Sequence, residues 1–305
     1  MPQWRPQGKG QSRKALPSPV VQIPVGALTF DVTVAGPEDG PVVILLHGFP
    51  QTSACWHRVV PVLADAGYRV VAPDQRGYSP GARPEGVAAY HSTELTADVL
   101  GIADAVGAER FHLVGHDWGA SIAWQLAARH GDRLLTVTPI SVPHPLAYAT
   151  ALASTETDQE QRSSYFPMFR AEGAEDGMLA NGAAGLRMIY LAGGLTEEEA
   201  APHLEALSRP EALGAALNWY RAAGGHLIED LGPITVPTLH VWSTEDLALG
   251  REGAEATGDF VEGPYELAVL DGVDHWIPDH APDELNALLT SHLSGFARGS
   301  GTDGS

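Results

Sequence analysis

The 305-residue sequence holds a single cysteine, Cys55, so no disulfide can form within the chain. It has no run of about 18 apolar residues, the usual minimum for a membrane-spanning helix. Neither a cysteine pair nor a His-Glu-x-x-His spacing occurs, so no metal site is predicted. These absences favour a cytoplasmic protein. Only two lysines, Lys9 and Lys14, occur beside abundant Ala, Gly and Arg, a composition typical of a GC-rich bacterial genome.

Basic residues are scarce as well, with 18 Lys and Arg against 38 Asp and Glu, which gives a formal net charge of −20. Such an acidic chain should repel nucleic acid and anionic membranes, so we expect neither as a partner. Residues 1–19 carry the two lysines without any acidic residue or apolar run. They are predicted to form a disordered arm, not a secretory signal. Residues 294–305 lack apolar periodicity and are predicted to form a disordered tail.

Short apolar runs alternate with helical stretches in two parts of the chain, which predicts an α/β fold with a mostly parallel sheet flanked by helices. The predicted strands are Val20–Ile23, Leu28–Val34, Pro41–Leu46, Arg69–Ala72, Phe111–Val114, Leu134–Ile140, Thr238–Trp242 and Glu266–Leu270. Pro24 and Gly26 should turn the first hairpin. The predicted helices between strands are Thr52–Ala66, which Pro61 could break, Ser92–Val106 and Asp117–His130.

The alternation stops in the middle of the chain. Residues 144–232 read as helical, for example at Thr196–Ser208 and Glu211–Ala223. We therefore expect a core domain of residues 20–143 and 233–293, with residues 144–232 inserted as a helical cap.

A nucleophile motif lies between a predicted strand and a predicted helix. Residues 115–119 read Gly115-His116-Asp117-Trp118-Gly119, a small–x–nucleophile–x–small pattern that is typical of the nucleophile elbow of α/β-hydrolases. The small residues permit a sharp turn and close approach of strand and helix. A carboxylate at this position would attack a saturated carbon bearing a leaving group and form an ester with it. Asp117 therefore favours epoxide opening or carbon–halogen cleavage over ester or peptide hydrolysis.

Hydrolysis of such an ester needs a base. His275 follows the last predicted strand, and imidazole titrates near neutrality. Asp246 follows the preceding strand and is the expected partner that orients His275, with Glu245 as an alternative. The chain order of nucleophile, acid and histidine is that of α/β-hydrolases.

Hydrolysis also needs donors for an oxyanion. We expect them to be two backbone N–H groups, that of Trp118 at a helix N-terminus and that of Phe49 in a loop after an early strand. Pro50 has no N–H and can only shape this loop. His112 and His116 near the elbow are expected to be structural.

Four segments together resemble the α/β-hydrolases of the epoxide hydrolase and haloalkane dehalogenase group. They are His47-Gly48-Phe49-Pro50, Asp74-Gln75-Arg76-Gly77-Tyr78-Ser79, Gly115-His116-Asp117-Trp118-Gly119 and His275-Trp276. The resemblance spans roughly residues 25–292. It implies a hydrolase that uses water and needs no cofactor, with a small-molecule epoxide as substrate. A dehalogenase with the same core residues and a non-catalytic ligand-binding protein are the alternatives.

Two cap tyrosines that hold the epoxide oxygen are a feature of the epoxide hydrolase branch. Asn218-Trp219-Tyr220-Arg221 resembles the segment with the second tyrosine, which implies this role for Tyr220. The segment after Ser164-Tyr165-Phe166 is similar to the one with the first, which implies Tyr165, with Tyr148 and Tyr190 as competitors. Dehalogenases often have Asn where this chain has Phe49, which favours epoxides. The residues expected to bind substrate are Trp118, Phe49, Trp219 and Trp276.

Overall fold

The computed structural model describes residues 19–296. One eight-stranded sheet forms its centre, in the order β1-β2-β4-β3-β5-β6-β7-β8. The β1–β2 and β2–β4 pairs are antiparallel and the remaining pairs are parallel, which confirms the predicted fold class. The strands are β1 (Val20–Val25), β2 (Leu28–Ala35), β3 (Val42–Leu46), β4 (Arg69–Pro73), β5 (Phe111–His116), β6 (Leu134–Ile140), β7 (Thr238–Ser243) and β8 (Tyr265–Leu270).

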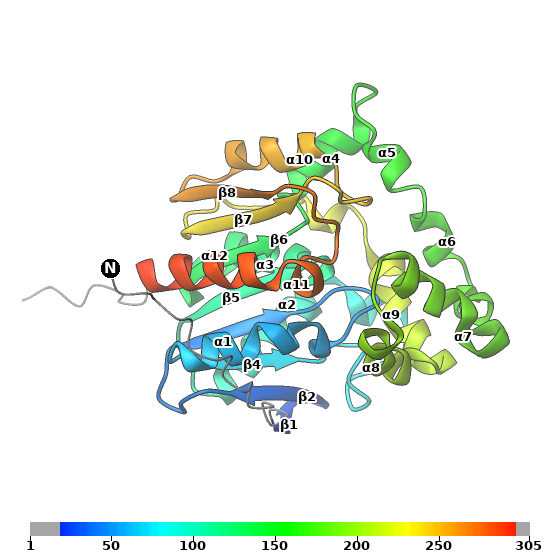
Figure 1. Cartoon of the computed structure of the whole chain (residues 1–305), viewed down its shortest axis with the longest axis horizontal. Coiled ribbons are helices and arrows are strands. Elements are labelled where there is room, and N and C mark those ends of the chain that lie inside the picture. Colours follow the sequence, from blue (N-terminus) through cyan, green and yellow to red (C-terminus); the bar gives the residue numbers. More distant parts are fainter. Residues whose placement is uncertain (1–18, 297–305) are drawn as a thin grey trace, which may run out of the picture.

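Helices cover both faces of this sheet (Figure 1). On β3, Ile44 and Leu46 belong to the apolar cluster on the α2 and α3 side, whereas Val43 and Leu45 belong to the cluster on the α1 and α12 side. Because successive strand side chains point to opposite faces, a strand buried on both sides needs a continuous apolar run. These helices are α1 (Val60–Asp65), α2 (Ser92–Ala105), α3 (Trp118–Arg129) and α12 (Pro282–Gly295).

The segment between β6 and β7 is helical, as its sequence indicated. Figure 1 shows α6 to α9 grouped together at one end of the sheet. The first helix of the segment, α4, packs instead beside α10 (Arg251–Ala256) of the core. The helices of the segment are α4 (Pro145–Ala153), α5 (Gln159–Arg162), α6 (Phe166–Arg170), α7 (Ala174–Ala192), α8 (Glu197–Leu207) and α9 (Pro210–Ala222).

Three sequence-based boundaries were wrong. Pro24 lies in β1 and not in the turn, because β1 is an edge strand and can tolerate a missing N–H. The stretch 52–66 forms two helices, η1 (Ser53–Arg58) and α1, and Pro61 lies in the first turn of α1, where its missing N–H interrupts no helical bond. Helix α12 continues to Gly295, past the expected start of the tail. Residues 1–18 and 297–305 lie outside the described residues.

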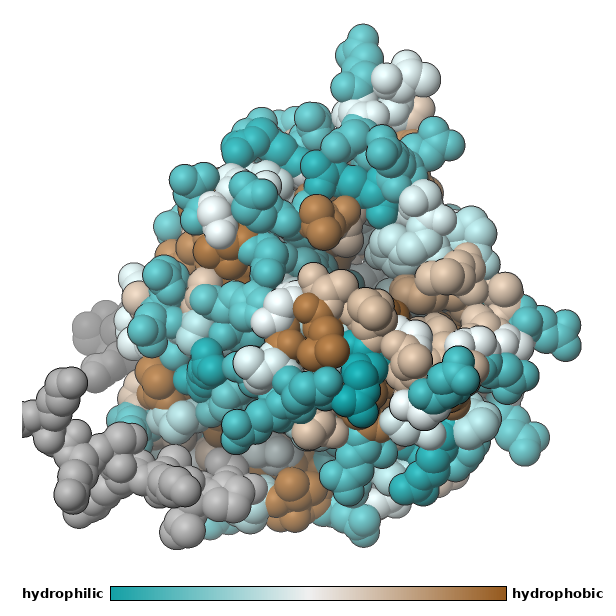
Figure 2. All heavy atoms as spheres, turned by 45° about the vertical axis from the view of Figure 1, so that its right-hand side comes forward, coloured by the Kyte–Doolittle hydropathy of each residue, from teal (hydrophilic) through white to brown (hydrophobic). Residues whose placement is uncertain are grey.

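The visible surface is mostly hydrophilic. Figure 2 shows hydrophilic side chains over much of one face, with apolar side chains in smaller groups among them. Within residues 19–296, no helix is both long enough and apolar enough to cross a bilayer.

Candidate active site

Asp117 occupies a sharp turn between β5 and α3. Its backbone has φ 53° and ψ −120°, in the positive-φ region that non-glycine residues rarely adopt. The turn also brings two chain segments very close. A Cβ added to Gly115 would collide with the carbonyl of Gly119, and one added to Gly119 would collide with that of Leu46. The close approach that the elbow motif predicted therefore requires glycine at both positions.

The two carboxylate oxygens of Asp117 have different surroundings. Oδ1 accepts a 2.8 Å hydrogen bond from the backbone N–H of Phe49. Oδ2 lies 3.6 Å from Nε2 of His275. A Cβ on Gly48 would collide with Asp117 Oδ1, so a glycine there lets the loop after β3 approach the carboxylate. One oxygen is thus held by a donor, while the other faces the imidazole.

Trp118 is the first residue of α3, so its backbone N–H belongs to the turn that has no helical partner. The carboxylate of Asp117 makes no capping hydrogen bond to this first turn. The Trp118 indole stands perpendicular to the ring of Tyr220, with centroids 5.0 Å apart. Trp118 therefore belongs to the elbow and also contacts α9.

His275 lies in the loop after β8, and its partner is Asp246. Nδ1–H of His275 donates to Asp246 Oδ2 at 2.8 Å. The second carboxylate oxygen, Oδ1, accepts the backbone N–H groups of Ala248 at 2.8 Å and Leu249 at 3.0 Å. Asp246 is 1% exposed, so these bonds replace the water that the carboxylate loses. The acid that contacts the histidine is Asp246 and not the alternative, Glu245.

Electrostatics make His275 a cation at neutral pH in the free protein. Burial lowers its pKa, but the carboxylates of Asp246 and Asp117 raise it more, to about 10. Burial raises the pKa of Asp246. Two effects lower it by more than burial raises it: the positive charge of His275, and the hydrogen bonds from His275, Ala248 and Leu249. The net shift of this pKa is therefore downward. The imidazolium therefore lies between two carboxylates.

Three contacts that steady this pair had no signal in the sequence. Nε2–H of His116 donates to the carbonyl of His275 at 2.8 Å, and Oγ of Ser141 donates to the same carbonyl at 3.4 Å. Arg162 of α5 donates to the carbonyl of Asp246. All three reach backbone oxygens, which every residue type carries, so no side-chain pattern could identify them. Burial lowers the pKa of His116 to about 4, which keeps it neutral.

No set of three or more His, Cys, Asp or Glu side chains within residues 19–296 is arranged to hold a metal ion. His112, the other histidine near the elbow, is fully buried, and its Nδ1 lies 2.9 Å from Oγ1 of Thr136 on the neighbouring strand.

The helical segment between β6 and β7 brings two of the four candidate tyrosines to the elbow. The ring of Tyr220, on α9, packs against that of Phe49 with centroids 5.2 Å apart. The ring centroids of Tyr165 and Tyr220 are 6.2 Å apart. Burial raises the pKa of both hydroxyls well above the usual value, and the nearby charge of Asp117 raises it further. Both are therefore protonated donors at neutral pH. The other two hydroxyls have partners elsewhere, Tyr148 with Oγ of Ser163 and Tyr190 with the carbonyl of Pro50.

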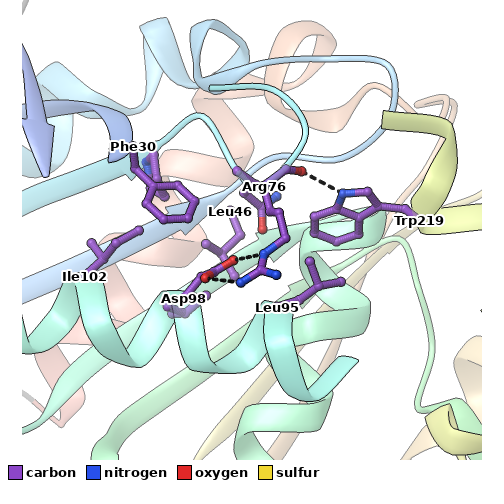
Figure 3. A pocket seen from close by; sticks show the side chains of 10 residues that line it. Phe30, Leu46, Arg76, Leu95, Asp98, Ile102 and Trp219 are labelled. Carbon is purple, nitrogen blue, oxygen red and sulfur yellow. Dashed lines mark hydrogen bonds and ion pairs between the residues drawn. The ribbon is translucent and has the colours of Figure 1, made fainter. Parts of the chain in front are cut away.

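The two remaining candidate tryptophans connect the helical segment between β6 and β7 with the rest of the chain. Nε1–H of Trp219 donates to the carbonyl of Arg76 at 2.8 Å, and Arg76 forms a two-bonded ion pair with the buried Asp98, at 2.6 and 2.7 Å (Figure 3). The indole of Trp276 packs so closely against Gly193 that a Cβ there would collide with its Nε1. The N–H of Trp219 is already bonded, so it is not free to donate to a ligand. This bond fixes the position of α9, which carries Tyr220.

Comparison with known proteins shows the family of the chain. The alpha/beta hydrolase fold family matches residues 41–282. Epoxide hydrolase A of Mycobacterium tuberculosis is 35% identical over 303 residues, covering 87% of this chain and 94% of that protein. The AB hydrolase superfamily protein YfhM of Bacillus subtilis is 35% identical over 277 residues, with the same coverage.

A solved structure described among novel epoxide hydrolases of the alpha/beta hydrolases superfamily, in metagenomes from hot environments, has a TM-score of 0.82 and 30% identity. The match covers 93% of this chain and 100% of that one. The fold and the Asp–His–Asp site define the chain as an α/β-hydrolase. Within this superfamily it belongs to the epoxide hydrolase and haloalkane dehalogenase group, and it is a hydrolytic enzyme, as the motifs predicted.

Proposed function

We propose that this enzyme hydrolyses an epoxide to a vicinal diol through an ester of Asp117. The observation that carries the proposal is that the two carboxylate oxygens of Asp117 have different partners. Phe49 N–H holds Oδ1 at 2.8 Å, so Oδ2 is the oxygen left to attack. The names of the relatives support the choice of substrate class.

In the first step, Oδ2 attacks one ring carbon from the side opposite its oxygen. The new bond joins Oδ2 to carbon, and the carbon–oxygen bond of the ring breaks. Tyr165 and Tyr220 donate hydrogen bonds to the oxygen as negative charge develops on it, and one of them supplies the proton. The product of this step is a hydroxyalkyl ester of Asp117.

In the second step, water attacks the carbonyl carbon of the ester. Ester formation removes the negative charge of Asp117, one of the causes that hold the pKa of His275 at about 10. The pKa of His275 therefore falls, and the imidazolium gives its proton, through solvent, to the tyrosinate left by the first step, so that the neutral imidazole becomes a base for water. Charge develops on Oδ1, where Phe49 N–H already donates and the N–H of Trp118 is the second proposed donor. The diol leaves and the carboxylate is restored.

A single turnover in heavy-oxygen water tests the ester route. We expect the label to enter the Asp117 carboxylate, because water attacks that carbon and not the substrate. Peptide mass analysis after one turnover locates the label. Label found only in the diol of the first turnover would refute the ester. Binding of an epoxide without any turnover would instead indicate a ligand-binding protein.

Replacement of Tyr220 by phenylalanine separates epoxide opening from carbon–halogen cleavage. The opening ring produces an alkoxide that needs a proton, whereas a halide leaves as a stable anion. We therefore expect Tyr220→Phe to slow ester formation from an epoxide by roughly 10²-fold. Stopped-flow measurement of the first turnover gives this rate. Tyr148→Phe is the matched control, since the Tyr148 hydroxyl is bonded to Ser163. Unchanged epoxide turnover together with halide release from haloalkanes would favour a dehalogenase.

The division of the chain is part of the proposal. Residues 144–232 act as the cap, over a core of residues 20–143 and 233–293. The contribution of Tyr165 and Tyr220 to the site supports this division. The cytoplasm is the proposed location, supported by the lone cysteine, which leaves no internal disulfide to maintain.

A further inference from the structure

The cap also touches the loop that carries the oxyanion donor. We propose that Tyr190 and His203, two buried cap residues, are positioning residues that hold the loop of residues 47–52 and thereby aim Phe49 N–H at Oδ1 of Asp117. This inference rests on the proposed function. It gives the cap a second task, in the hydrolysis of the ester, beside the task of its two tyrosines at the substrate oxygen.

Tyr190 of α7 holds the residue after Phe49. Its hydroxyl donates to the carbonyl of Pro50 at 2.5 Å, and its side chain is 0% exposed. Pro50 has no N–H, so its carbonyl is its only backbone hydrogen-bonding group. Pro50 is itself buried, so without the Tyr190 hydroxyl this carbonyl would lose both water and its partner.

His203 of α8 holds the other end of the loop. Its Nδ1 lies 3.0 Å from the backbone N of Thr52 and 2.9 Å from its hydroxyl. The backbone N–H can only donate, so Nδ1 accepts and the ring is neutral with its proton on Nε2. Burial lowers the pKa of His203 to about 3, which preserves this state. The rings of His203 and Tyr190 stack with centroids 5.6 Å apart, so the two contacts support each other.

The core holds the same loop at different points. Gln75 N–H donates to Nε2 of His47 at 3.0 Å, and Gln51 donates to Asp279 at 2.7 Å. Between these anchors, the only side-chain bond to residues 48–50 from the cap is that of Tyr190, while Phe49 N–H points to Asp117. The Tyr190 bond therefore acts on the part of the loop that carries the donor, while His203 fixes Thr52 at the end of the loop.

The rates of ester formation and ester hydrolysis should respond differently if Phe49 N–H moves away from Oδ1 of Asp117. During ester formation, negative charge leaves Oδ1, so a weaker hydrogen bond from Phe49 does not raise the barrier. During ester hydrolysis, charge builds on Oδ1, so the same weakening does raise it. Loss of the Tyr190 or His203 contact should thus slow ester decay selectively.

The experiment compares the two rates in single turnovers, with intact-mass detection of the ester. We expect Tyr190→Phe to slow ester decay by about tenfold and to change ester formation by less than about twofold. Tyr90→Phe is the matched control, because the Tyr90 hydroxyl makes the same kind of bond, to the carbonyl of Pro84 at 3.1 Å, away from this loop. It should leave both rates unchanged.

A pair of His203 variants keeps the test independent of the tyrosine. His203→Asn retains an acceptor near Thr52 and should largely preserve ester decay, whereas His203→Leu removes the acceptor and should slow it as Tyr190→Phe does. Equal slowing of both steps, or no change in either, would overturn the positioning role. Absence of any ester in both the wild-type enzyme and His275→Gln would refute the proposed function instead, so the two failures are distinct.

Discussion

Replacement of Asp117 by alanine should abolish both ester formation and diol production, with activity falling by roughly 10⁴-fold or more. The methyl group has no electron pair to attack carbon, and the other carboxylate of the described site, Asp246, is not free to replace it. Asp246 is fully occupied by His275, Ala248 and Leu249. Intact-mass spectra should show no adduct at any time after mixing with an epoxide.

The control for this variant is Asp271→Ala. Asp271 is an exposed acid in the loop that leads to His275, and it bonds to the Thr244 hydroxyl at 3.2 Å. Its loss should leave turnover close to that of the wild type. If Asp117→Ala kept wild-type turnover while folded, Asp117 would be removed from the mechanism.

Replacement of His275 by glutamine should trap the ester. Oδ2 of Asp117 can still attack, but no base remains to activate water, so ester decay should slow by roughly 10²–10⁴-fold. Covalent enzyme should then accumulate and be seen as a mass increase equal to that of the substrate. His280→Gln is the matched control. His280 lies five residues after His275 and bonds to Asp274, and it contacts neither Asp117 nor Asp246 through a hydrogen bond. Rapid loss of the adduct in His275→Gln would exclude His275 as the base.

The pH dependence of ester decay in the wild type should also show that His275 is the base. Ester decay should become faster as pH rises, since His275 acts only when it is deprotonated. Its apparent pKa in the ester should lie below the value of about 10 in the free enzyme, because Asp117 is then uncharged. His275→Gln should lose this dependence. A decay rate that falls with rising pH would contradict the role of His275 as a base.

Stability should respond to the same group. The pKa of His275 in the folded enzyme lies above its ordinary value of 6.5. Its charge therefore stabilises the fold fully below about pH 6.5, and this contribution is lost as pH rises through about 10. The melting temperature of the wild type should exceed that of His275→Gln at low pH, and this difference should shrink as pH rises through that range.

Much of the site was readable from residue types and their order. Asp117, Asp246 and His275 each follow a strand of the parallel part of the sheet, and such strands place their carboxyl ends at one edge. The nearness of the three was thus predictable without coordinates. The two cap tyrosines depended on resemblance, because no periodicity distinguishes Tyr165 or Tyr220 from another buried tyrosine.

Other features were not readable. The bond from the N–H of Trp219 to the carbonyl of Arg76 had no signal in the sequence, and the expected contact of Trp219 with substrate stays a prediction. Tyr190 was a competitor for the substrate oxygen, yet its hydroxyl holds Pro50. His203 gave no signal at all, although it bonds to a residue 151 positions away. In each case a backbone group in a remote segment is a partner, and His203 also contacts the hydroxyl of Thr52.

The sequence by itself determined the alternation of strands and helices, the carboxylate at the elbow and the order of acid and base. These follow from local periodicity and side-chain chemistry, which act over a few residues. Only the tertiary structure decided which oxygen of Asp117 meets Phe49 N–H and which cap side chains secure that loop. Such contacts depend on how the cap packs on the core, and their backbone partners have no residue identity that a sequence could reveal.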